Sequence, residues 1–256
     1  MKGHRPVAQR SNLKLWLIVL GLSLGPAVSN GFARFAYGLV LPAMRDDLGW
    51  SYTAAGWINT ANAIGYLLGA LMALALISRL GPSFLFIAGM ALTALALIMS
   101  GLTRDFQVLS FWRIIAGIGG APVFIAGGVM ASALFRDDKA KNALAIAVYF
   151  GGGGIGMIIC GAALPYMVAW YGIGVWPLTW LLVGILSYLC FLPGYWSAAA
   201  SPAPPPAPKG EGGRLPTSRM FFAEAAYFCF GLGYVIYVTF LIAWLHYRGA
   251  GADLIA

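Results

Sequence analysis

Arg34 is the residue of this sequence whose chemistry most needs an explanation, because it lies inside a long apolar run. Ser23, Asn30, Arg34 and Tyr37 follow one another at spacings of seven, four and three residues. On an α-helix these spacings place the four side chains on one face. A charge at membrane depth costs about 2.5–3.5 kcal/mol on insertion scales and usually faces a cavity. We expect this polar stripe to line a water-filled path; the alternative is that Arg34 extends to the outer lipid headgroups.

Arg113 repeats the pattern in a later apolar run. Arg113, Gly117, Gly120 and Phe124 share one helical face, so the glycines allow a neighbouring helix or a ligand to lie close below the guanidinium. At a rise of about 1.5 Å per residue, both arginines lie at a comparable depth, about 10–12 Å from the outer ends of their helices. We expect Arg113 to face the same cavity as Arg34. The alternative is a packing residue that hydrogen-bonds to backbone carbonyls.

Asn59, Asn62 and Tyr66 form a third polar stripe at helical spacing. Amide side chains between membrane helices serve either as ligand contacts or as hydrogen-bond partners of a neighbouring helix. Both interpretations stay open here. The candidate residues for a substrate cavity are therefore Asn30, Arg34, Tyr37, Asn59, Asn62 and Arg113.

The sequence contains no arrangement of residues that suggests catalysis. No Ser-His-Asp, Cys-His or paired-carboxylate pattern is visible, and His4 and His246 have no metal-ligand spacing around them. Residues 151–156 match the dinucleotide pattern GxGxxG, but no acidic residue occurs between Asp138 and Glu211 to bind a ribose. We therefore expect helix packing or a bend at these glycines, and we predict no enzyme, catalytic residue, metal or cofactor.

The composition predicts a membrane protein. Hydrophobic residues make up 61% of the 256 residues and charged residues only 9%, whereas soluble domains carry about 25% charge. A helix of roughly 20 apolar residues crosses a bilayer, and lipid offers no partner for an unpaired backbone amide. The net charge of +8 is spread over the joints between apolar runs rather than gathered on one face, which argues against a nucleic-acid partner. The lipid bilayer is the expected environment.

Seven apolar runs separated by short polar joints predict an all-α integral membrane protein, a polytopic helical bundle. The runs cover residues 15–41, 54–77, 83–101, 106–134, 143–169, 175–193 and 221–245.

The joint at residues 194–220 differs from the others, because residues 201–208 are rich in proline and cannot form a helix. It divides the chain into an N-terminal segment (1–14), six spans (15–193), this linker and a last span (221–256). With the N-terminus in the cytoplasm, 11 of the 16 basic residues face inward and 3 face outward. The positive-inside rule therefore predicts a cytoplasmic N-terminus and a cytoplasmic linker.

Several motifs resemble those of the major facilitator superfamily. Gly31, Tyr37 and Leu41 recur as Gly231, Tyr237 and Leu241 at a constant offset of 200, directly after the proline-rich break. Residues 109–121 are similar to the fourth-helix motif, an Arg followed by a Gly-rich turn, with Ala116 where Gln is common. Arg79 and Gly81 resemble the signature loop between the second and third helices, but Ser78 replaces its usual acid. Residues 31–37, 41–44, 47–51 and 56–62 resemble the YbfB/YjiJ-like branch of bacterial facilitators.

This resemblance implies a secondary active transporter of a small solute in the bacterial cytoplasmic (inner) membrane, working by alternating access. Such transporters have twelve spans, so we expect a truncated protein or a fragment that holds one half and the first helix of the second. Alternatives are a non-transporting membrane protein or an assembly partner that self-associates, and, less favoured, an integral-membrane enzyme. Because Arg34 and Arg113 are cations and the six spans contain no acid, we expect an anionic substrate.

Overall fold

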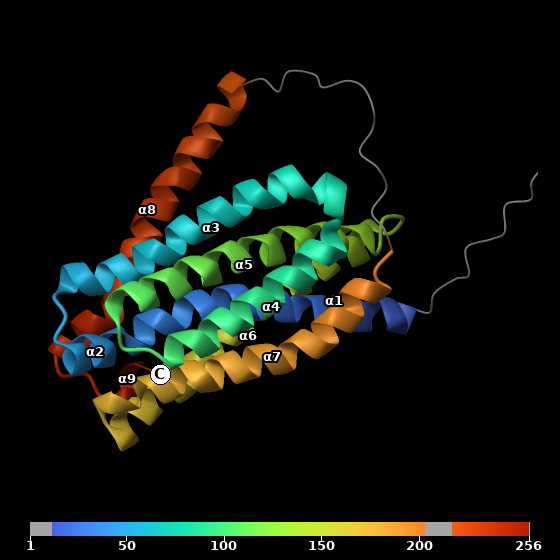
Figure 1. The fold of residues 1–256 in the computed structure, drawn as a ribbon. Coiled ribbons are helices and arrows are strands. Elements are labelled where there is room, and N and C mark those ends of the chain that lie inside the picture. Colours follow the sequence, from blue (N-terminus) through green and yellow to red (C-terminus); the bar gives the residue numbers. More distant parts are fainter. Residues whose placement is uncertain (1–11, 203–216, 256) are drawn as a thin grey trace, which may run out of the picture.

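The computed structural model describes residues 12–202 and 217–255, and these residues form helices with no strand among them (Figure 1). The first helical rod is continuous over three elements: α1 (Asn12–Pro26), the π-helix η1 (Ala27–Phe35) and α2 (Ala36–Leu48). The helices that follow are α3 (Tyr52–Leu80), α4 (Pro82–Gly101), α5 (Phe106–Ala133), α6 (Lys139–Tyr171), the short 3-10 helix η2 (Ile173–Val175), α7 (Trp176–Ala200), α8 (Thr217–Tyr247) and α9 (Ala252–Ile255).

Six rods are long and apolar enough to cross a membrane, as the fold class predicted. They are Asn12–Leu48, Tyr52–Leu80, Pro82–Gly101, Phe106–Ala133, Lys139–Tyr171 and Ile173–Ala200. The seventh predicted span lies on α8, where the apolar stretch found is Phe221–Gly231. That stretch is shorter than a bilayer requires, so a crossing by α8 stays a prediction.

Parts of the polar joints that separate the predicted runs are helical in the structure, among them residues 45–47 between the first two runs and residues 194–200 at the start of the linker. Residues 45–47 belong to α2, because the helix continues to Leu48 and ends only where Gly49 adopts a left-handed conformation (φ 64°). Residues 194–200 belong to α7, which ends at Ala200 although Pro193 lies within it. Short polar stretches at a helix end can stay helical in the headgroup region, where water satisfies their side chains. The proline-rich part of the linker, residues 203–216, lies outside the described residues.

Local sequence signals fix the other helix boundaries. Ser51 accepts a hydrogen bond from the Ala54 amide at the start of α3, and Asp105 accepts two, from the Gln107 and Val108 amides, at the start of α5. These side chains satisfy amides that a helix leaves without partners in its first turn. Gly81 (φ 79°) and Gly172 (φ 83°) end α3 and α6 with backbone conformations that disfavour larger residues.

Glycines set the distance between the helices that lie side by side. A Cβ on Gly65 of α3 would lie 2.0 Å from the Ile114 carbonyl oxygen of α5, and a Cβ on Gly117 of α5 would lie 2.2 Å from the Asn62 carbonyl oxygen. In the run at 151–156, Gly152 and Gly156 contact the first rod through Ser23 and Ala27, whereas a Cβ on Gly151 would meet nothing within 4 Å. This run therefore packs α6 against the first rod within an unbroken helix.

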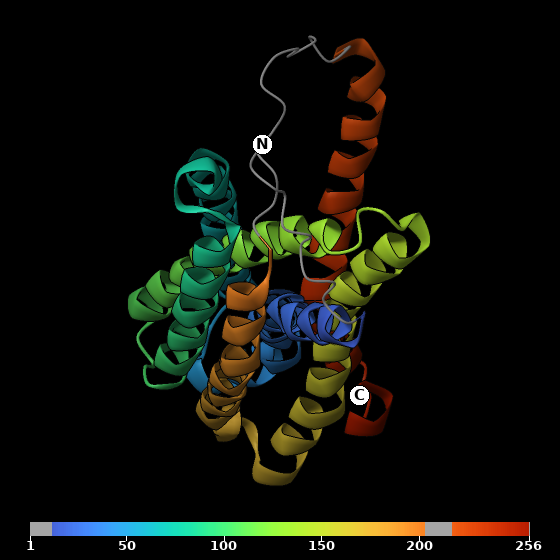
Figure 2. The same ribbon diagram turned by 90° about the vertical axis from the view of Figure 1, so that its right-hand side faces the viewer.

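Helix α8 lies apart from the six-rod bundle at its start and meets the bundle at its end. Figures 1 and 2 show its first turns rising away from the other helices. Its last turns contribute Ala243, His246 and Tyr247 to a small pocket shared with Arg45 and Asp46 at the end of α2. The end of α8 therefore contacts the bundle at the end of α2.

Candidate functional site

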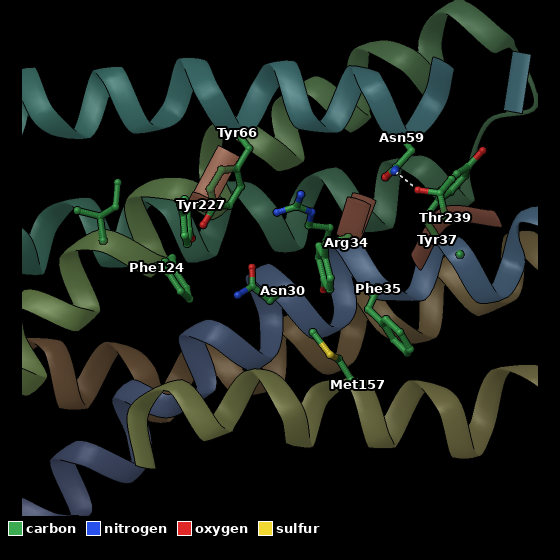
Figure 3. Close-up of a pocket in the computed structure, with 13 residues that line it drawn as sticks. Asn30, Arg34, Phe35, Tyr37, Asn59, Tyr66, Phe124, Met157, Tyr227 and Thr239 are labelled. Carbon is green, nitrogen blue, oxygen red and sulfur yellow. Dashed lines mark hydrogen bonds between the residues drawn. The ribbon is translucent and has the colours of Figure 1, made fainter. Parts of the chain in front are cut away.

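A cavity of about 280 Å³ lies between the first rod, α3, α5, α6 and α8 (Figure 3). Its polar lining consists of Asn30 and Arg34 on η1, Asn59 on α3 and Thr239 on α8. Most of the remaining lining is aromatic: Phe35, Tyr37, Tyr66, Phe124, Tyr227 and Tyr234. The cavity combines one cation, two amides and a wall of rings.

Arg34 lies half-buried on the last turn of the π-helix and faces this cavity. Its guanidinium carbon lies 5.6 Å from the centre of the Tyr66 ring, and Figure 3 shows the side chain directed toward Tyr66. The ion pairs found among residues 12–202 and 217–255 are Arg45–Asp46, Arg104–Asp47 and Lys141–Asp138, and none involves Arg34. π-Helical turns occur often at functional sites. Here the π-helix carries the one cation that lines this cavity.

Arg113 lies behind the cavity wall instead of in it, contrary to the prediction that both arginines face one cavity. Its side chain is 1% exposed and its Nη2 donates a hydrogen bond to the carbonyl oxygen of Ala33. The guanidinium carbon lies 4.7 Å from the centre of the Trp180 ring and 5.8 Å from that of Tyr37. These two rings cover Arg113, which corresponds to the packing alternative with a backbone carbonyl as acceptor.

The two asparagines of the third stripe have different positions. Asn59 lines the cavity and donates to the Thr239 hydroxyl of α8 at 2.6 Å. Asn62 is 3% exposed and donates to the Arg113 backbone carbonyl at 3.0 Å, so it joins α3 to α5. The positions differ because residues 59 and 62 lie about 60° apart around a helix, and α5 covers only the second.

Four of the six sequence candidates thus meet at the cavity, namely Asn30, Arg34, Tyr37 and Asn59, and Asn62 and Arg113 do not line it. Tyr37 has its ring at the wall, and its hydroxyl donates to the Ala55 carbonyl at 2.6 Å. Tyr227, Tyr234 and Thr239 also line the cavity and were not among the sequence candidates. The internal repeat contained a signal for Tyr234, because at the offset of 200 this residue takes the place of Arg34.

The described residues contain no group of three or more His, Cys, Asp or Glu side chains that could hold a metal ion. The cavity also has no acidic side chain in its lining. The lining offers one positive charge, amide groups and aromatic faces, which are groups that can bind a solute.

The fold is that of the major facilitator transporters. A bacterial homologue of the human lysosomal transporter Spinster, solved inward-facing and unoccupied, matches 95% of this chain and 56% of its own with a TM-score of 0.67 at 19% identity. The nucleoside transporter NupG (D323A mutant) matches 90% of this chain and 58% of its own (TM-score 0.66, 15% identity). A D-xylose-proton symporter matches 94% of this chain and 64% of its own chain (TM-score 0.66, 14% identity). At these identities the likeness shows the fold alone.

The family follows from the sequence comparison. The family model described as "Uncharacterised MFS-type transporter YbfB" matches residues 26–256, and the chain belongs to this family of transporters. The inner membrane transport protein YdhP of Escherichia coli (strain K12) is 29% identical over 140 residues, which are 55% of this chain and 35% of YdhP. The matched region thus spans about a third of that relative.

Proposed function

We propose that this chain provides the binding half of a secondary active transporter in a bacterial inner membrane, and that its solute carries an anionic group bound by Arg34. The observation that supports the proposal most is the charge of Arg34, which faces the cavity with no carboxylate beside it in the described part of the chain. A planar guanidinium binds carboxylates and phosphates through paired, charge-assisted hydrogen bonds. The support for an anion rests on Arg34 alone, since Arg113 is covered.

Alternating access needs two halves that move against each other around a central site. In the proposed arrangement, residues 15–193 form one half, residues 194–220 form a cytoplasmic linker and residues 221–256 begin the second half. The N-terminal residues 1–14 lie in the cytoplasm. The remaining wall of the cavity comes from further helices of a second half or from self-association of the chain.

The position of α8 supports a conformation open toward the linker. Its end contacts α2 at the pocket of Arg45, Asp46 and His246, whereas Phe221 and Phe222 at its start are 62% and 78% exposed. A transporter closed at one end and open at the other is in one of the two states that alternating access requires. On the proposed topology, this state admits solute from the cytoplasm.

The test is solute flux in cells that produce this half together with the second half that completes the cavity. Labelled anionic, neutral and cationic solutes are followed for uptake and efflux in cells with the wild-type chain, with Arg34→Gln and with Arg34→Lys. We expect saturable flux of one or more anions, reduced at least about tenfold by the Gln variant, because hydrogen bonds to charged groups are worth about 1.5–3 kcal/mol. The Lys variant retains part of the flux, because it keeps the charge and loses the paired geometry. Anion flux unchanged in Arg34→Gln, at equal protein levels, contradicts the proposal.

A further inference from the structure

We infer that the solute bound at Arg34 is an aromatic carboxylate or a similar planar aromatic anion. The inference rests on the proposed function, because it adds to the anionic group a second feature of the same solute. It concerns the rings of the cavity, which an anion alone does not require.

The aromatic residues come to the cavity from four separate helical rods, so they are not the periodic face of one helix. Tyr66 belongs to α3, Phe124 to α5 and Tyr227 and Tyr234 to α8, while Phe35 and Tyr37 lie on the first rod. Figure 3 shows Tyr66, Tyr227 and Phe124 gathered around the end of the cavity into which Arg34 and Asn30 are directed. Rings from separate helices that meet around one space form a site for a flat apolar body.

Two of these rings contact further rings outside the cavity. Phe124 packs on Phe150, with ring centres 5.1 Å apart at 52°, and Tyr234 stacks on Phe230, with centres 5.6 Å apart at 17°. Such contacts restrict the rotation of the cavity rings. A ring that is already fixed in orientation loses little conformational entropy when a ligand stacks on it.

The polar groups define where the anionic end of the solute lies. Asn59 and Thr239 hydrogen-bond to each other, whereas the Asn30 amide has no hydrogen-bond partner among the described residues. Arg34 and Asn30 are one helical turn apart, so both can donate to one carboxylate. The Arg34 guanidinium also lies over Tyr66, so the ring of a solute that binds Arg34 through its carboxylate lies within reach of the Tyr66 ring.

Charge excludes the main alternative, and the volume agrees with a small aromatic anion. Aromatic cages commonly bind quaternary ammonium groups, but here the cavity contains a cation and its lining has no acid. Its volume of about 280 Å³ is at the lower limit of ligand pockets, which span about 300–1,000 Å³. A single ring with a carboxylate fits such a space.

The test is equilibrium binding of radiolabelled benzoate to the purified full chain, with competition by three matched compounds. Cyclohexanecarboxylate has the same charge and similar size without an aromatic ring. Benzamide has the ring without the charge, and acetate has the charge with only a methyl group in place of the ring. We expect benzoate to bind at least fivefold more tightly than cyclohexanecarboxylate and more tightly still than benzamide or acetate. Tyr66→Leu and Phe124→Leu remove the preference for benzoate over cyclohexanecarboxylate. The control Phe111→Leu, an exposed ring on the same helix as Phe124, leaves the preference unchanged.

Each outcome separates this inference from the proposed function. Equal affinity for benzoate and cyclohexanecarboxylate, or the absence of benzoate binding by folded protein, overturns the aromatic inference; the flux experiment, which includes aliphatic anions, then decides on the proposed function. Equal affinity for benzoate and benzamide contradicts the role of Arg34 in charge selection and thus the proposed function itself. A preference for benzoate that persists in both Leu variants also overturns the inference.

Discussion

Arg34 and Arg113 are the same residue type on adjacent parts of the structure, yet their surroundings are opposite. Arg34 is half-buried, faces the cavity and has the Tyr66 ring beside it. Arg113 is 1% exposed, and its guanidinium donates to the carbonyl of Ala33, the residue directly before Arg34. One cation is therefore available to a ligand, and the other holds the backbone that carries the first.

The difference teaches that the role of an intramembrane arginine depends on which rings and carbonyls surround it. Insertion cost is similar for any charge at this depth. Trp180 and Tyr37 cover Arg113 and stabilise its charge through their ring faces, although its Nε and Nη1 have no hydrogen-bond partner among the described residues. Four predictions test the contrast, from the largest expected effect to the smallest.

Gly117→Leu disrupts the contact between α3 and α5, on which the surroundings of both Arg34 and Arg113 depend. A Cβ at residue 117 would lie 2.2 Å from the Asn62 carbonyl oxygen and 2.5 Å from the Tyr66 amide nitrogen, so any larger side chain separates α3 from α5. We expect a loss of about 3 kcal/mol or more, since overpacking against backbone cannot relax by a side-chain rotation. The measurement is the yield and melting temperature of monodisperse protein in detergent.

Gly151→Leu is the matched control, because a Cβ at residue 151 meets nothing within 4 Å. This variant keeps its stability or gains slightly, as glycine is a poor helix former. Equal melting temperatures for the two variants would mean that the α3–α5 contact does not limit stability.

Arg113→Ala costs far more stability than Arg34→Ala. The first leaves a cavity under Trp180 and removes the hydrogen bond to the Ala33 carbonyl, with an expected loss of about 2–4 kcal/mol by analogy with large-to-small core changes. The second removes a side chain from an open space, and we expect a change below about 1 kcal/mol. Thermal unfolding in one detergent measures both.

Arg113→Met sharpens this prediction. Methionine keeps much of the volume and removes a charge that the interior compensates incompletely, so it recovers a large part of the loss seen with alanine. If Arg113→Met is as unstable as Arg113→Ala, the charge and its hydrogen bond to Ala33 matter more than the packing. If Arg34→Ala is the less stable alanine variant, the contrast between the two arginines is wrong.

Thiol labelling distinguishes the two positions by access to water. In a background without Cys160, Cys190 and Cys229, which are free thiols, cysteine is placed at residue 34 or at residue 113. A water-soluble thiol reagent modifies Arg34→Cys, whereas Arg113→Cys reacts several-fold more slowly, because reactivity requires exposure. Denatured protein serves as the control for complete labelling, and similar rates at the two positions in folded protein contradict the assignment.

The sequence predicted the helices that carry the two arginines better than it predicted the surroundings of each arginine. The six long apolar runs were found to within a residue or within the observed rods, because lipid imposes length and composition on every span. Helical spacing also placed Asn30, Arg34 and Tyr37 on one face, as the cavity confirms for these three. The ends of the helices were predicted less well. Residues 45–47 are charged and residues 194–200 begin with a glycine after Pro193, yet both stretches are helical.

The position of Arg113 could not be predicted in the same way. Its covering ring Trp180 lies 67 residues further along the chain, and no periodicity connects the two. The contributions of Tyr227 and Thr239 depend on the angle at which α8 meets α3, which is a property of packing between distant helices. Local patterns determine which residues share a face, and tertiary contacts determine what that face meets.

Asp138 contrasts with both arginines, because it is an exposed charge with hydrogen-bond and ion-pair partners. Its substitution has the smallest expected effect. Its carboxylate accepts a hydrogen bond from the Lys141 amide at 3.0 Å at the start of α6 and pairs with the Lys141 ammonium at 2.9 Å. The backbone hydrogen bond, followed by the Lys141 side chain, lowers the pKa of Asp138 below its ordinary value of 3.8. The resulting stability is complete above that ordinary value and is lost as the pH falls through the lowered pKa.

Asp138→Asn keeps an acceptor at the helix start and removes the titration. We therefore expect wild type to be slightly more stable than this variant at pH 7, and the difference to shrink below about pH 3.8. Melting temperatures of both proteins from pH 7 to pH 3 provide the measurement, and the difference between them cancels the titration of every other acid. Parallel curves over the whole range would show that the Asp138 charge contributes nothing. An exposed, fully paired charge would then be energetically silent, which would strengthen the view that the charges with large effects in this protein are the unpaired ones within the membrane.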